Sequence, residues 1–152
     1  MDIKRRNFMN QFKDTKFMTA AEKAMVWKQW KAFIAGGFQW KHFTERIYKH
    51  LSLHCSFIAH YNRAGFYDTY FSNPEDTIRF VSQFDGSKGC ISVEYGMDFW
   101  LKGEYEDLNQ SMCEAIEPYK ESIYQKCAEH IRDRDLTQAR SLLAKHGLAK
   151  EA

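Results

Sequence analysis

The chain has 152 residues, of which 44% are hydrophobic and 16% are aromatic. This length suits one domain with its own core, and the composition excludes fibrous and low-complexity proteins. Four cysteines without a close pair exclude a disulfide scaffold, and no apolar run is long enough to span a bilayer. We therefore expect a single cytoplasmic domain over residues 1–152, with a disordered tail at 148–152.

Charge is distributed unevenly along the chain. Residues 1–63 carry 12 Lys/Arg against 4 Asp/Glu, a net charge of +8, whereas residues 64–117 carry 3 against 11, a net charge of −8. Such asymmetry is typical of proteins with a macromolecular partner, and a basic segment most often meets nucleic acid. The alternative is that the two segments pack against each other and partly neutralise their charges.

The basic half begins with residues 1–18, which are either a terminal helix docked by its aromatic side chains or a basic arm. Thr19 and Glu22 form a capping box, which predicts a helix that starts there and ends at the glycine pair 36–37. An apolar stripe then continues over residues 38–63 and predicts one long helix.

The acidic part begins with an aromatic connector at residues 66–71. The sequence Asn-Pro-Glu-Asp at 73–76 is a strong helix start, because asparagine caps the helix and proline fits its first turn. This helix should run to about Phe84. An alternating pattern then favours a small β-hairpin near residues 90–102.

One alternative remains for this region, in which residues 78–84 pair with residues 90–95 as strands. After Glu104 a helical stripe returns, and Pro118 within it predicts either a kink or a second helix. Asp135 is expected to cap a last helix that ends at Gly147. Together the elements predict an all-α or α-dominated domain, with five to six helices around an aromatic-rich core.

Lysines and arginines attract phosphates, and aromatic faces stack on bases, so the basic half is the main binding candidate. Its candidate nucleic-acid or partner-binding residues are Lys4, Arg5, Arg6, Lys13, Lys16, Lys28 and Lys31. The acidic stretch could meet a basic protein surface instead. The candidate acidic partner face consists of Glu104, Glu106, Asp107 and Glu114.

His50 and His54 stand four residues apart, a spacing that can ligate zinc, but the glutamate of the H-E-x-x-H motif is absent. Buried, hydrogen-bonded histidines are the more common outcome. The acidic cluster over 98–117 could hold a metal, although its carboxylates follow a pattern typical of a solvated helix face. We assign no catalytic residue and no cofactor.

The sequence therefore favours a small non-catalytic binding protein that acts through charged surfaces on nucleic acid or on a protein, as an inhibitor or regulator. A metal-dependent enzyme that uses His50 and His54 or the acidic cluster 98–117 is the first alternative. A self-assembling structural protein is the second, because complementary charged surfaces can join copies into a homo-oligomer. We expect no membrane partner.

Overall fold

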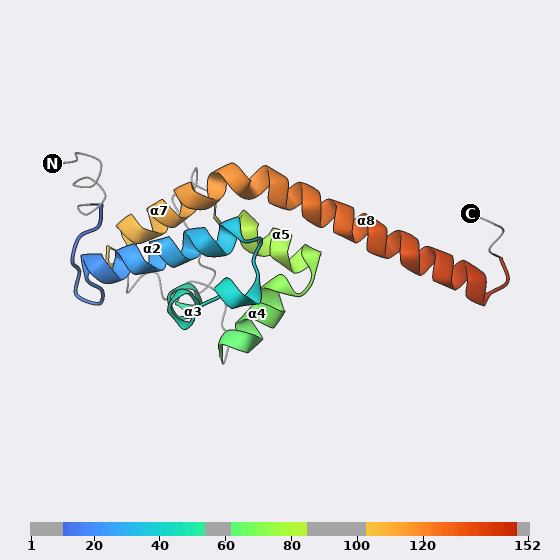
Figure 1. Ribbon diagram of the computed structural model, residues 1–152, viewed down its shortest axis with the longest axis horizontal. Helices are drawn as coiled ribbons and strands as arrows, with labels where there is room; N and C mark the ends of the chain where they lie inside the picture. Colours follow the sequence, from blue (N-terminus) through green and yellow to red (C-terminus); the bar gives the residue numbers. More distant parts are fainter. Residues whose placement is uncertain (1–10, 54–61, 85–102, 149–152) are drawn as a thin grey trace.

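A computed structural model describes residues 11–53, 62–84 and 103–148 (Figure 1). In these ranges the chain is helical around a buried aromatic cluster, which confirms the expected all-α class with an aromatic-rich core. The hairpin expected near 90–102 lies outside the described residues. The described elements are α2 (Ala20–Ala35), η1 (Trp40–His42), α3 (Glu45–Ser52), α4 (Arg63–Phe71), α5 (Pro74–Ser82), α7 (Glu106–Ile116), η3 (Glu117–Tyr119) and α8 (Lys120–Lys145).

Thr19 caps the start of α2 as predicted, although the Glu22 carboxylate bonds to the Thr19 hydroxyl in place of the backbone amide that a capping box would use. The Thr19 hydroxyl accepts a hydrogen bond from the Glu22 amide at 3.2 Å and donates one to the Glu22 carboxylate at 3.1 Å. The helix ends at Gly36, and Gly37 has a φ of +76°, a conformation that glycine adopts without strain. The face of α2 that points into the core carries Val26, Trp30, Phe33 and Ile34.

The single helix expected over residues 38–63 is wrong. Phe38 has a φ of +61° and is followed by the η1 turn, so helix α3 begins only after Thr44. The Thr44 hydroxyl accepts the Ile47 amide at 3.2 Å, which supplies an N-cap where the periodicity suggested a helix interior.

A second cap starts α4, which replaces the aromatic connector expected at residues 66–71. The Asn62 side chain accepts the Gly65 amide at 2.7 Å, and helical geometry continues to Phe71. Phe66 and Tyr70, four residues apart, face the core from this helix. Phe66 and Tyr70 are therefore helical core residues, and Gly65 lies in the first turn of α4.

Helix α5 begins where the Asn-Pro-Glu-Asp sequence predicts it. The Asn73 side chain accepts the Asp76 amide at 3.2 Å, and Pro74 occupies the first turn. The helix ends at Ser82, slightly before the expected Phe84. The alternative that residues 78–84 form a strand is wrong, because most of that segment is helical.

Replacing Asn73 with alanine is expected to lower the free energy of unfolding by about 1 kcal/mol, because the first turn of α5 loses its side-chain acceptor. Urea denaturation followed by circular dichroism measures the change. The nearby exposed Ser72→Ala variant, which keeps that cap, should stay within about 0.5 kcal/mol of the parent. Equal effects for the two variants would contradict a capping role.

Pro118 separates the apolar stripe that follows Glu104 into two helices. This agrees with the second of the two alternatives predicted from the sequence, two helices in place of one kinked helix. Pro118 lies in the short η3 turn between α7 and α8. The prediction that Asp135 caps a separate helix is wrong, because α8 runs unbroken from Lys120 to Lys145. Nothing near Asp135 interrupts helical hydrogen bonding, whereas Gly147, with a φ of +67°, follows the helix end as expected.

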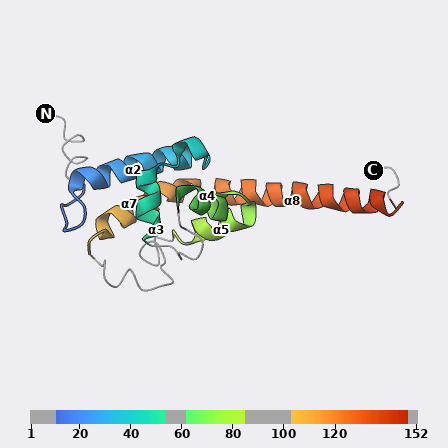
Figure 2. The same ribbon diagram turned by 90° about the horizontal axis from the view of Figure 1, so that it is seen from below.

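Helix α2 packs against α3 and α7, and α5 packs against α8 (Figures 1 and 2). Trp30 stacks on Phe84 with ring centroids 5.0 Å apart, and its indole N–H donates to the Met112 carbonyl at 3.0 Å. The distal part of α8 projects beyond the other helices (Figure 2). No helix within the described residues combines the length and apolar character needed to cross a membrane.

Candidate functional site

A buried ion pair joins the basic and acidic parts of the chain. The Lys23 side chain is 0% exposed, and its ammonium donates to the Asp107 carboxylate at 2.9 Å and to the Lys13 carbonyl at 2.8 Å. The Lys13 amide also donates to Asp107 at 2.9 Å. The segment before α2 is therefore fastened to α7, and it is not a helix over residues 11–18.

The expected acidic partner face is divided by this arrangement. Besides Asp107, Glu104 also binds its own chain, because its carboxylate accepts the Phe17 amide at 3.2 Å. Glu106 and Glu114 remain exposed on α7, and Gln110 donates to Glu114 at 3.3 Å. The alternative of packing with mutual neutralisation thus holds for Asp107, whereas Glu104 packs against the basic segment through a backbone amide.

The hydrogen bonds around Asp107 set its protonation. Burial alone would raise the pKa of its carboxyl, but the amides of Lys13 and Leu108 and the ammonium of Lys23 donate to the carboxylate and hold the pKa below its ordinary value. Asp107 therefore stays ionised at neutral pH, and its charge compensates the buried Lys23.

Two of the lysines predicted to bind a partner lie on α2. Lys28 is exposed, and the Lys31 ammonium lies 3.4 Å from the centroid of the Trp27 ring. Partial burial and the nearby positive charge of Lys28 lower the pKa of Lys31. An anion at this position would relieve the repulsion between the two lysines.

Two more of the predicted lysines lie before α2. Lys13 and Lys16 are exposed, and the Lys16 ammonium lies 5.5 Å from the ring centroid of Phe17, which is 54% exposed. Lys4, Arg5 and Arg6 lie outside the described residues. We define the basic face as Lys13, Lys16, Lys28 and Lys31. Within the described ranges, no carboxylate forms an ion pair with these four ammonium groups.

Sequence reasoning missed two features of the structure. Trp40 is 43% exposed, and the Arg63 guanidinium lies 4.7 Å from its ring centroid. The buried Lys23 was not singled out either. Its place on the stripe of Val26 and Trp30, at three and seven residues, was the signal that could have identified it.

His50 is a buried histidine that binds a neighbour, as expected from its place on the apolar stripe. One ring nitrogen, Nε2, lies 2.7 Å from Asn109 Oδ1, and the ring meets Tyr105 edge-on with centroids 5.0 Å apart. His54 lies outside the described residues. In the described parts of the chain, no group of three or more His, Cys, Asp or Glu side chains could hold a metal ion.

A cleft of about 500 Å³ lies between the end of α2, the α4–α5 corner and α8. Ile34 and Phe71 give it an apolar lining, and Cys127 and His130 lie on its α8 side. Burial and the negative charge of Glu75 raise the pKa of the Cys127 thiol. The thiol is therefore protonated and a poor nucleophile, so the cleft suits apolar contact better than covalent chemistry.

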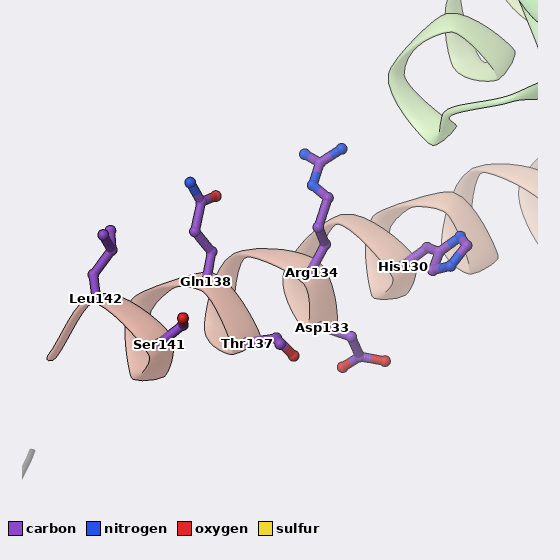
Figure 3. A pocket seen from close by; sticks show the side chains of 7 residues that line it. All are labelled: His130, Asp133, Arg134, Thr137, Gln138, Ser141 and Leu142. Carbon is purple, nitrogen blue, oxygen red and sulfur yellow. The ribbon is translucent and has the colours of Figure 1, made fainter. Parts of the chain in front are cut away.

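A second hollow lies along the distal half of α8. Figure 3 shows Arg134, Gln138 and Leu142 on one side of the helix, at intervals of four residues. All the residues that line this hollow come from α8 alone, so it is an open helix surface without an opposing wall. Arg134 pairs with Glu75 of α5, and its hydrogen bonds lower the pKa of that carboxyl.

Comparisons with protein families, curated proteins and solved structures give no match to this chain. The described residues define a small all-α protein in which Asp107 neutralises the buried Lys23, with exposed lysines on and before α2 and a projecting C-terminal helix.

Proposed function

We propose that this protein is a non-catalytic cytoplasmic binding protein that holds nucleic acid on its basic face. The observation that carries the proposal is the difference between the two charged segments. Glu104 and Asp107 are bound to their own chain, whereas the four lysines of the basic face have no ion-pair partner among the described residues.

The shape of α2 supports contact with a phosphate backbone. The exposed side of this helix carries small side chains at Ala21, Ala32 and Ala35 beside Lys28 and Lys31. A nucleic-acid strand can therefore approach closely while the lysines reach its phosphates. Phe17 offers an exposed ring on which a base can stack. Most of the affinity should be electrostatic and independent of sequence.

The Lys28→Gln/Lys31→Gln variant is expected to bind nucleic acid about tenfold more weakly at low salt, because two phosphate contacts are lost. The plot of log affinity against log salt should become shallower by about two units. Fluorescence anisotropy with labelled single-stranded and duplex oligonucleotides over a salt series measures both quantities.

The matched control is Lys126→Gln/Lys145→Gln, which removes the same charge from α8 and should change affinity much less. Equal losses for the two variants would show that net charge, not the basic face, determines binding. If the parent protein fails to bind either oligonucleotide at low salt, the proposal is wrong. Replacing Lys4, Arg5 and Arg6 with alanine should weaken binding further if the N-terminal arm takes part.

A further inference from the structure

Among the described residues, the distal half of α8 contacts the rest of the domain through Arg134 near its start, and the residues beyond it are exposed. Arg134 pairs with Glu75 of α5, and from Arg132 to Leu148 every residue is exposed. We define the projecting segment as residues 132–145. An isolated helix of this length is only marginally stable in water, so pairing with another element would stabilise it.

The projecting segment carries an apolar stripe on the side away from the domain. Leu136, Ala139 and Leu143 follow one another at intervals of three and four residues, and the two leucines are 42% and 45% exposed. At 100° per residue, all three lie about 140–200° around the axis from Arg134, which pairs with α5. The stripe therefore faces solvent.

We propose that this stripe pairs with the same stripe of a second copy of the chain, with the two α8 helices antiparallel about a twofold axis. The register that places Leu136 opposite the partner's Ala139 also places Leu143 opposite the partner's Arg132. The small side chain of Ala139 lets the two axes approach closely, and the Arg132 stem can cover a leucine while its charge reaches water.

The charged residues beside the stripe support pairing with a second copy and support the antiparallel orientation of the two helices. In the antiparallel register, Asp133 lies beside the partner's Arg140, and the twofold axis repeats that ion pair. Glu129 then lies opposite the partner's His146. A parallel pair would place Arg132 against its own copy and Glu129 against its own copy, so like charges would meet in two layers.

The position of the domains permits the pairing. The stripe lies on the opposite side of α8 from α5, and α8 extends past the other described helices (Figure 1). Two antiparallel copies would therefore hold their domains at opposite ends of the paired helices. Only two leucines on each copy would be buried by the pairing, so we expect weak association with a dissociation constant of about 10–100 µM.

Analytical ultracentrifugation of the full chain over a concentration series tests the proposal. The parent should approach twice its 18.0 kDa mass as concentration rises, and Leu136→Asp/Leu143→Asp should weaken association at least about 100-fold. The control Gln138→Asp/Ser141→Asp adds the same charge to the opposite face and should still dimerise. A monomeric parent at every concentration, or a dimer insensitive to the leucine changes, would overturn the proposal.

A charge exchange tests the direction of the pair. Asp133→Arg and Arg140→Asp should each weaken the dimer, and the double variant should restore it, because the cross-chain ion pair is rebuilt in reverse. Recovery in Asp135→Arg/Arg140→Asp, without recovery in the first double variant, would identify a parallel pair and contradict the antiparallel arrangement. All of these residues are exposed, so circular dichroism should show unchanged folding.

Discussion

Replacing Asp107 with alanine is expected to lower the free energy of unfolding by about 3–5 kcal/mol. The change removes the carboxylate that compensates the fully buried Lys23 ammonium. The ammonium keeps its hydrogen bond to the uncharged Lys13 carbonyl. The substitution also removes the acceptor of the Lys13 amide, which fastens the segment before α2 to α7. Urea denaturation at neutral pH measures the loss.

Two variants separate this effect from a general effect of charge. Glu106→Ala removes an exposed neighbouring carboxylate and should change stability by less than about 0.5 kcal/mol. The Lys23→Met/Asp107→Ala double variant should be more stable than Asp107→Ala alone, because no buried charge is left without its counterion. A loss below about 1 kcal/mol for Asp107→Ala would contradict the role of the ion pair.

The same ion pair predicts a dependence on pH. Its hydrogen bonds hold the pKa of Asp107 below the ordinary value of 3.8 in the folded protein. The carboxylate therefore contributes its full stabilisation above pH 3.8, and that contribution is lost as pH falls through the lower folded pKa. The difference in stability between parent and Asp107→Ala should narrow across that acidic range.

Phe33→Ala is expected to cost about 3–5 kcal/mol, because the side chain is fully buried in the aromatic cluster. Its ring centroid lies 5.1 Å from each of Phe38, Phe43 and Phe71, so truncation leaves a cavity that rigid rings cannot readily fill. Thermal and urea unfolding both measure the loss. Phe17→Ala removes an exposed ring of the same kind and should change stability by less than about 0.5 kcal/mol. Similar losses in both variants would contradict this description of the core.

The sequence predicted elements that local chemistry determines. The Thr19 cap, the Asn73 cap and Pro118 each specify a helix boundary through the nearest few residues. The prediction of one helix over residues 38–63 was wrong because apolar periodicity indicates which side chains are buried. It does not indicate whether helical backbone geometry continues without a break. The caps at Thr44 and Asn62 interrupt that segment while the stripe persists on either side.

The candidate site was predictable in composition and not in arrangement. The basic composition of the N-terminal half is evident from the sequence, but the sequence did not indicate that Lys31 is half-buried against Trp27. Glu104 and Asp107 accept hydrogen bonds from residues about 90 positions earlier in the chain, and no local sequence pattern encodes such contacts. At Asp135 the sequence predicted a helix boundary that the structure does not have. Aspartate is a good capping residue, but it is also compatible with an exposed position inside a helix.

The 26 residues of α8 give it a length of about 39 Å at 1.5 Å per residue. A molecule with such a rod on one side should tumble anisotropically, and its small-angle scattering should contain long interatomic vectors that a sphere of equal mass lacks. A fluorophore attached near Lys145 would sit far from the tryptophans of α2, so energy transfer between them would report whether the rod stays straight.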